Sequence, residues 1–345
     1  MSEIQEKISF QIVTPSGVIV PDIIDKKTTG KLYINWGVDN KLPQYLWDNY
    51  LKCSNLQAII NTITNYICGK GIDVGKFHEK QKLERVIQKC VFDYILFGGF
   101  AVECIRNKMG GISSINYLNV MNIRVNEELT TAYLSTKWGS YSGKDIIELP
   151  LFNKESKQNH FVIYYRGEIT RNINPVPMYI AALKSIQILN NTRNFHLKNV
   201  ENSFAASAII SINDTNIKAR EMKEIKDKIE KQFCGSQNAG KFMVINSPDN
   251  EHSVSIVKLE ADKFDEMYKA LTESSVEDIY TAFRINKVLV GQNINTGFSR
   301  VEYEDIYNIY YETVIVPLKN NIIDVFNEID IPIKFNKFNI QWSEK

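Results

Sequence analysis

Residues 175–202 constrain the fold of this chain more than any other stretch. Pro175 and Pro177 open it, and no further proline or glycine occurs before Gly235. Proline is tolerated in the first turn of a helix but breaks a helix interior, so the sequence predicts one long helix over residues 175–202. At about 1.5 Å per residue, roughly 25 residues of helix would span ~38 Å.

The two halves of this predicted helix differ in polarity. The first half has apolar residues at helical spacing, which predicts one buried face made of Ile180, Leu183, Ile186 and Leu189. The second half is polar nearly all round and contains Arg193, His196, Lys198 and Asn199. A helix that begins in a core and ends polar typically crosses a solvated space or packs against a like partner. Periodicity alone leaves open a long surface helix in an α+β domain.

Helices and then a β-rich block are predicted before this stretch. Ser54 and Gln57 have the spacing of a capping box, which predicts a helix start, and Gly69 closes that helix. A second helix is predicted over residues 79–97. Alternating apolar residues then predict a hairpin and further short strands: Phe100–Arg106, Ile112–Leu118, Val120–Val125, Thr130–Thr136, Ile146–Phe152 and Phe161–Tyr165.

Strands and helices also alternate after the long helix. The predicted strands are Ala208–Ile212, Lys241–Asn246, Val254–Leu259 and a bulged strand within Ile331–Trp342. The predicted helices cover residues 217–233, 262–283 and 300–329. The last of these contains Pro317, so we expect it to kink or break there.

Charge and cysteine content exclude several classes of protein. The net charge of +1 argues against a sequence-specific nucleic-acid binder, because such domains usually carry a basic patch. The five cysteines are scattered, and Cys68, Cys90 and Cys104 lie on apolar periodic segments, which indicates reduced core residues in a cytosolic compartment. The sequence predicts neither a signal peptide nor a membrane span.

The pattern that most resembles an active-site motif is Gly235-Ser-Gln-Asn-Ala-Gly-Lys241, a G-x-x-x-x-G-K. A phosphate-binding loop of this kind needs a Ser or Thr after the lysine to hold magnesium, and Phe242 stands there. It also needs a following helix, whereas a strand is predicted. His78, His160, His196 and His252 lack partners at ligand spacing. We therefore predict no catalytic residue, no cofactor and no metal site.

Three stretches together resemble the portal proteins of tailed bacteriophages. The first contains Trp36-Gly-Val-Asp-Asn40 with Leu42-Pro43, then Ser54, then Cys68-Gly-Lys-Gly71. The second contains Phe195–Phe204, Ala208-Ile-Ile-Ser211 and Gly235–Val244. The third contains Phe283-Arg-Ile285, Val288-Leu-Val-Gly291 and Ile315-Val-Pro317. They follow one another over about residues 35–330.

The resemblance implies an α+β fold with a helical stem, a β-rich clip and a mixed α/β wing. On this basis we expect the wing in residues 1–99, with helix 79–97 as a candidate second stem helix. Residues 100–174 would be a β-rich block containing the clip, and residues 175–202 would be the stem helix. Residues 203–299 would be a wing or tunnel region. Residues 300–345 would be a C-terminal helix and strand that form a short crown or part of the wing.

The resemblance also implies a non-enzymatic function in the virion. Identical subunits, commonly twelve, would form a ring at one capsid vertex, assembled in the host cytoplasm, through which double-stranded DNA is packaged and ejected. Expected partners are the terminase large subunit, a head-tail adaptor and the major capsid protein, and no membrane. The expected DNA-channel residues are Arg193, His196, Lys198, Asn199 and Lys241. The alternatives are a nucleic-acid-processing enzyme and a monomeric structural or adaptor protein of the virion.

Overall fold

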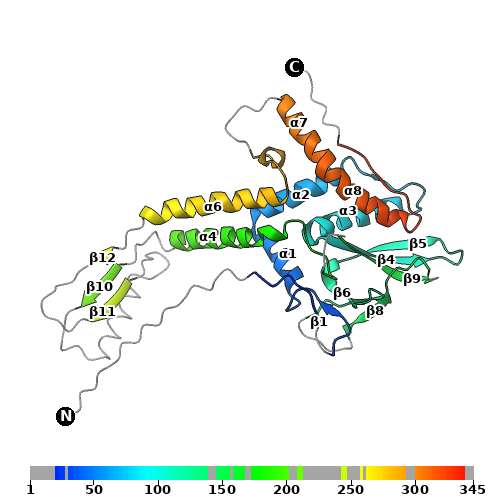
Figure 1. The fold of residues 1–345 in the computed structure, drawn as a ribbon, viewed down its shortest axis with the longest axis horizontal. Coiled ribbons are helices and arrows are strands. Elements are labelled where there is room, and N and C mark those ends of the chain that lie inside the picture. The colour runs from blue at the N-terminus through cyan, green and yellow to red at the C-terminus, as the bar shows by residue number, and fades with distance from the viewer. Residues whose placement is uncertain are drawn as a thin grey trace, which may run out of the picture. The chain divides into compact units, whose positions relative to one another are not determined.

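The computed structural model divides the chain into two compact units (Figure 1). The larger unit comprises residues 1–184 and 282–345, and the smaller unit comprises residues 185–281. The structure describes residues 20–27, 30–138, 145–155, 158–167, 172–201, 208–212, 242–246, 257–258, 262–292 and 300–338. Both units contain helices and strands, so the α+β class is confirmed.

Three helices form the first part of the larger unit: α1 (Leu42–Lys52), α2 (Ser54–Cys68) and α3 (Lys80–Phe97). Helix α2 packs against α3 and buries all of its predicted apolar stripe, namely Leu56, Ile59, Ile60, Ile63 and Ile67. Helix α3 ends at Gly98, whose φ of +85° is left-handed. A Cβ at Gly98 would lie 2.2 Å from the Val176 carbonyl oxygen, so only glycine fits this helix end.

The predicted capping box at Ser54 is wrong, although the helix begins where expected. Ser54 is the first helical residue, and the residue at the N-cap is Cys53, which makes no side-chain cap. The Cys53 amide donates to the Asn49 carbonyl of α1, while its own carbonyl accepts from the Gln57 amide. Helices α1 and α2 are therefore joined by a single residue, which leaves no room for Ser54 to act as a cap.

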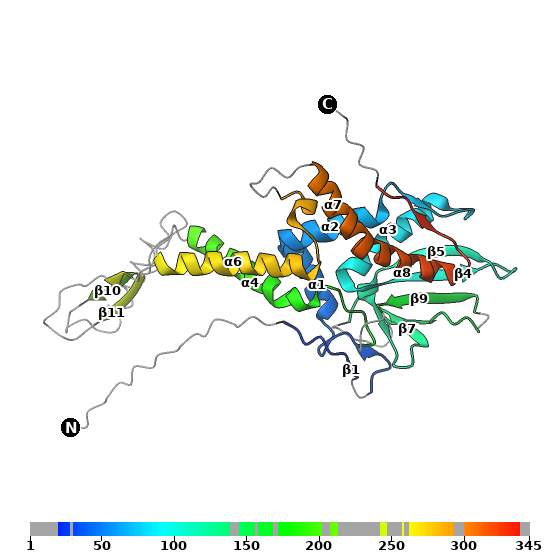
Figure 2. The ribbon, with the colours of Figure 1, turned by 45° about the horizontal axis from the view of Figure 1, so that its top comes forward.

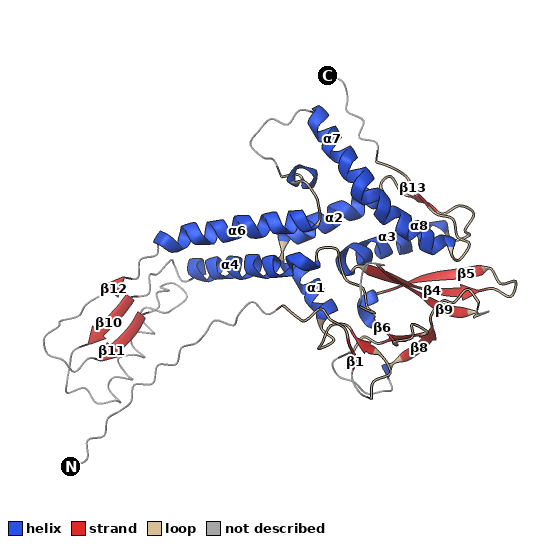
Figure 3. Ribbon diagram, viewed as in Figure 1, coloured by secondary structure: helices blue, strands red, loops and turns tan. Residues whose placement is uncertain are grey.

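Two antiparallel sheets follow these helices (Figure 3). The first has the order β5-β4-β9, with bounds β4 (Gly99–Arg106), β5 (Ile112–Leu118) and β9 (His160–Arg166). The second has the order β6-β7-β8, with bounds β6 (Ile123–Val125), β7 (Thr131–Leu134) and β8 (Ile147–Pro150). The predicted hairpin and short strands are therefore confirmed, except that the segment from Val120 opens with a 3₁₀ turn, η1 (Val120–Asn122).

A shared hydrophobic core joins the two sheets. It is made of Ala101, Ile123, Val125, Ala132, Leu151 and Val162. The Phe152 amide donates to the Val162 carbonyl at 2.8 Å, so the chain leaves β8 paired to β9. Helix α3 covers the first sheet by packing against β4 and β5. The β-rich block is thus part of the core of the larger unit.

The C-terminal helical segment does not break at Pro317, but its hydrogen-bonding pattern changes directly before this residue. It consists of α7 (Arg300–Tyr310), a π-helical turn η5 (Tyr311–Ile315) and α8 (Val316–Asn327). Pro317 lies in the first turn of α8, directly after the helical residues of η5. The π-helical turn places the change of hydrogen bonding directly before it. A 3₁₀ turn, η4 (Lys287–Val290), precedes α7 along the chain.

Four short strands form two further antiparallel pairs in the larger unit. Strand β3 (Ile72–Asp73) pairs with β13 (Lys334–Phe335), the described part of the predicted C-terminal strand. Strand β1 (Lys26–Lys27) pairs with β2 (Ile34–Asn35). The thiols of Cys53, Cys68, Cys90 and Cys104 are not in disulfides. Cys90 and Cys104 are buried and Cys68 is half-buried, which agrees with their predicted place in the core.

The smaller unit contains two long helices and a small sheet. Its helices are α4 (Leu183–Glu201), which begins two residues before the unit, and α6 (Asp262–Ala282). The sheet has the order β11-β10-β12, with bounds β10 (Ala208–Ile212), β11 (Phe242–Asn246) and β12 (Val257–Lys258). Strand β10 runs parallel to β11 and antiparallel to β12. The predicted helix 217–233 and the loop 235–241 lie outside the described residues.

The long helix begins at Leu183, later than its predicted start at Pro175. A 3₁₀ turn, η3 (Ile180–Ala182), precedes α4, and residues 175–179 are not helical. A residue before proline avoids the helical region, so the second proline of Pro175-Val-Pro177 holds Val176 extended. The Pro175 carbonyl accepts a hydrogen bond from the Trp36 indole at 3.0 Å. The two prolines therefore belong to a packed connection that precedes the helix.

Candidate functional site

Helices α4 and α6 form an antiparallel pair (Figure 2). Near one end, the Ser185 hydroxyl donates to the Asp278 carboxylate at 2.7 Å. Farther along α4, the His196 ring lies edge-on against the Tyr268 ring at 5.7 Å. The second contact lies later in α4 and earlier in α6, which fixes the opposite directions of the two helices. At about 1.5 Å per residue, the contacts are roughly 16 Å apart.

The exposure of α4 changes along its length in the way the sequence predicts. Leu183, Ile186 and Leu189 are buried. Arg193 and Asn194 are exposed, and Leu197 is 57% exposed. Helix α4 therefore buries one apolar face in its first half, and its second half is exposed at the described positions apart from Thr192, which is buried.

The predicted channel residues are only partly described by the structure. Arg193 and His196 are both exposed and stand three positions apart on α4, so they are neighbours on one helix face. Lys198 and Asn199 belong to the same helix, but their side chains lie outside the described set. Lys241 lies outside the described residues altogether. Four of the five candidates thus share one helix.

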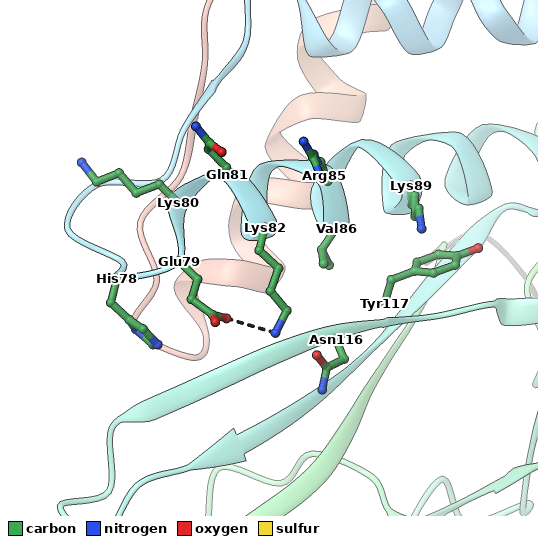
Figure 4. Close-up of a pocket in the computed structure, with 10 residues that line it drawn as sticks. All are labelled: His78, Glu79, Lys80, Gln81, Lys82, Arg85, Val86, Lys89, Asn116 and Tyr117. Carbon is green, nitrogen blue, oxygen red and sulfur yellow. Dashed lines mark ion pairs between the residues drawn. The ribbon is translucent and has the colours of Figure 1, made fainter.

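The structure contains a basic groove between α3 and β5 that was not predicted from the sequence (Figure 4). Its volume is about 870 Å³, and its cationic lining residues are Lys80, Lys82, Arg85 and Lys89. Lys82 forms an ion pair with Glu79 at 3.0 Å. The Lys89 ammonium lies 5.1 Å from the centre of the Tyr117 ring of β5. The detectable signal was the helical spacing of Lys82, Arg85 and Lys89, which an ordinary solvated helix face shares.

An aromatic hollow of about 700 Å³ adjoins this groove and shares Arg85, Lys89 and Tyr117 with it. Trp47 and Phe92 also line the hollow, and their rings meet at 6.4 Å.

Buried Asp93 connects α3 to the first sheet beneath the hollow. Its carboxylate accepts from the Tyr117 hydroxyl at 2.9 Å and from the Val120 amide at 3.4 Å. Burial raises the pKa of the Asp93 carboxyl to about 7, against the lowering effects of these hydrogen bonds and of Lys89.

Arg124 of β6 is the buried cation that holds the N-terminal motif in place. It is 2% exposed, and its guanidinium donates to the Met121 carbonyl at 2.9 Å and to Asn40. It also lies 5.5 Å from the Trp36 ring. Asn40, at a left-handed φ of +64°, accepts from the Trp36 amide at 3.0 Å. The motif Trp36–Asn40 is therefore a loop clamped onto the second sheet.

Burial lowers the pKa of Arg124 to about 10, so the side chain stays charged at neutral pH. The sequence hint for this site was a cation between two apolar residues, Ile123 and Val125, in one short strand. All three residues of that strand are buried.

Metal and membrane features are absent from the residues that the structure describes. Among them, no three His, Cys, Asp or Glu side chains come together as metal ligands. No described helix combines the length and the apolar character that crossing a bilayer requires.

The fold of this chain is similar to solved structures of a gene transfer agent neck and of a phage portal protein. The chain superposes on the neck of a native gene transfer agent particle, computed with C12 symmetry, with a TM-score of 0.55 at 12% identity, covering 85% of this chain and 83% of that one. It also superposes on an HK97-family phage portal protein from Corynebacterium diphtheriae with a TM-score of 0.51 at 10% identity, covering 84% and 94%. At such identities, the likeness establishes the fold class.

The family follows from the sequence itself. The model of the phage portal protein family matches residues 78–340, which is more than half of the chain. The chain therefore belongs to the phage portal protein family, and its function is that of a portal. This confirms the resemblance carried by the three sequence stretches. No curated protein matches the chain in sequence.

Proposed function

We propose that the chain assembles into a closed ring, commonly of twelve subunits, at one vertex of a phage capsid. The observation that carries this proposal is the family match over residues 78–340. The fold likeness to a neck computed with C12 symmetry supports it, since a ring of identical subunits has that symmetry. The ring would be assembled in the host cytoplasm and remain in the virion.

We further propose that α4 and α6 together form the stem. Helix 79–97 was expected to be a second stem helix, but α3 is packed against α2, β4 and β5 within the larger unit. Helix α6 instead pairs with α4 through Asp278 and Tyr268. Residues 202–261 connect the far ends of these two helices, and this connection contains the sheet β11-β10-β12. We therefore assign the clip to that connection in place of residues 100–174.

The wing would then be the larger unit. Its helices α1–α3, its two three-stranded sheets and its C-terminal helices belong to one compact unit. Residues 300–338 pack within this unit and are assigned to the wing, because α7 and α8 contact α2 directly or through the π-helical turn. This revises the expected wing or tunnel region at 203–299 and the expected crown at 300–345.

DNA passage through the ring would use the exposed face of α4. Arg193 and His196 are the described candidates, with Lys198, Asn199 and Lys241 as the remaining ones. Each phosphate contact makes binding more salt-dependent, so a near-neutral channel lets DNA slide where a strongly basic one would retain it. The net charge of +1 suits this role. The terminase large subunit, a head-tail adaptor and the major capsid protein are the proposed protein partners.

The decisive experiment is electron microscopy of the purified full-length chain, combined with sedimentation at several salt concentrations. Rings with a central channel are the expected result. A chain that stays monomeric or dimeric at micromolar concentration under every salt condition would contradict the proposal. An ATPase assay separates the enzyme alternative: we expect no hydrolysis, and Lys241→Ala should change neither hydrolysis nor the ring.

A further inference from the structure

We propose that neighbouring subunits meet through a basic strip on α3 of one copy and an acidic strip on α7 of the next. The basic strip is Arg85, Lys89 and Phe92, and the acidic strip is Glu302, Asp305 and Ile309. This inference rests on the ring proposed above and names the surfaces that close it.

The basic strip forms one exposed edge of α3. Arg85, Lys89 and Phe92 follow one another at intervals of four and three residues, which places them on one helix face. Arg85 and Lys89 are exposed, and Phe92 is half-buried. Arg85 and Lys89 line both the 870 Å³ groove and the 700 Å³ hollow, and Phe92 lines the hollow. The strip therefore consists of two cations followed by an apolar depression.

The acidic strip forms the outer edge of α7. Glu302, Asp305 and Ile309 follow one another at intervals of three and four residues, and all three are exposed. Ile309 is 65% exposed, although it is a large aliphatic side chain. The inner side of α7 is buried through Tyr307 and Tyr310. The strip therefore consists of two anions followed by an exposed apolar residue.

The two strips match in spacing as well as in charge. In the proposed register, Ile309 of one copy enters the hollow at Phe92 of the next copy. Asp305 then lies four residues before Ile309 on α7, and Lys89 lies three residues before Phe92 on α3. Glu302 and Arg85 each lie seven residues before the apolar residue of their own helix, about 10.5 Å along either helix. Both helices run in the same direction in this register. Two opposite-charge pairs and one apolar contact form together, which gives the contact both direction and register.

The two strips lie on different helices of one subunit. Helix α2 packs against α3 (Figure 1). The Tyr66 ring of α2 meets the Tyr307 ring of α7 at 5.3 Å. The strips thus belong to different helices that contact the same α2. A subunit can offer its acidic strip to one neighbour and its basic strip to the other, which is the head-to-tail contact that closed rings require.

An anionic nucleic acid is the other chemical class that two cations could attract. The spacing match favours a second copy, because double-stranded DNA offers phosphates to the cations but keeps its bases stacked within the duplex and presents no apolar side chain to the hollow. Nucleic-acid binding by α3 is therefore one of the outcomes that the experiment tests.

The test reverses the charges separately and then together in the full-length chain. Variant one carries Arg85→Glu and Lys89→Glu, variant two carries Glu302→Lys and Asp305→Lys, and variant three carries all four changes. The matched control carries Lys70→Glu and Lys76→Glu, two exposed lysines of the same unit that lie outside the strip. Circular dichroism and thermal melting check that each variant is folded, and sedimentation measures ring formation.

We expect variants one and two to need at least about tenfold higher concentration to form rings, because like charges then face each other across the contact. Variant three should recover ring formation, and the control should behave like the wild type. Rings in variants one and two at wild-type concentrations would overturn the inference and leave the proposed ring intact. If those variants keep the ring but lose affinity for DNA, the strip is a nucleic-acid site and the inference is wrong. If the wild type forms no rings, that result contradicts the proposed function and also the inference, which rests on it.

Discussion

Helices α3 and α4 have 18 and 19 residues, yet their second halves lie in different environments. Helix α3 carries a carboxylate, Asp93, into the core and satisfies it with Tyr117 and Val120. Helix α4 keeps Arg193 and Asn194 exposed in its second half. The difference shows that similar apolar periodicity occurs in two structural settings. Helix α3 packs into a core along its second half, whereas α4 is packed in its first half and exposed in its second.

The sharpest way to test the buried polar groups is to remove Arg124. Arg124→Ala should lower the free energy of unfolding by ~3–5 kcal/mol, because Asn40 and the Met121 carbonyl lose their buried donor. Chemical denaturation of the wild type and the variant measures the change. Arg193→Ala on the exposed half of α4 is the control, with an expected loss below ~0.5 kcal/mol. Equal losses would remove the distinction between the two regions.

The two halves of α4 provide the next comparison. Leu183→Ala should cost ~2–5 kcal/mol of unfolding free energy, because the side chain is 1% exposed and its truncation leaves a cavity. Asn194→Ala should cost well under ~1 kcal/mol, since the residue is exposed. The melting temperatures of both variants measure these losses. If both variants melt equally early, α4 is buried along its whole length and its assignment as a stem helix is wrong.

The pH dependence of stability isolates Asp93 on α3. Its folded pKa of about 7 lies above the ordinary carboxyl value of 3.8, so the folded state binds the proton more tightly than the unfolded state. Stability from this group is therefore present below about pH 4 and is lost as the pH rises toward 7, by at most ~1.4 kcal/mol per pH unit. Urea denaturation at pH 5 and pH 8 measures this loss. Asp93→Asn should reduce it, and an unchanged pH profile would show that Asp93 titrates normally.

The smallest expected effect concerns DNA binding by the exposed half of α4. Arg193→Ala should weaken DNA binding by the ring modestly and reduce the salt slope of log affinity by about one, because one phosphate contact is lost. Fluorescence anisotropy at several salt concentrations measures the slope. Lys70→Ala, an exposed lysine of the larger unit, is the matched control. An unchanged slope for Arg193→Ala would place this side chain away from the DNA.

Local patterns in the sequence were sufficient for most individual elements. The stripe on α2, the hairpin of β4 and β5 and strand β10 all follow from spacing or from residues a few positions apart. The same holds for the graded burial of α4, since Ile186 and Arg193 differ in polarity on the printed sequence. The motifs in their order along the chain also indicated the family, because family motifs are properties of sequence.

The tertiary structure decided which elements are partners. Strand β3 pairs with β13 from the other end of the chain, and α6 pairs with α4 through Asp278 and Tyr268. It also decided that Arg124 is a buried clamp and that Arg85 and Lys89 border a groove and a hollow. These outcomes depend on contacts between residues distant in sequence, which form only when the whole chain packs. Periodicity reports which face of a helix is apolar, but it contains no information about what that face meets.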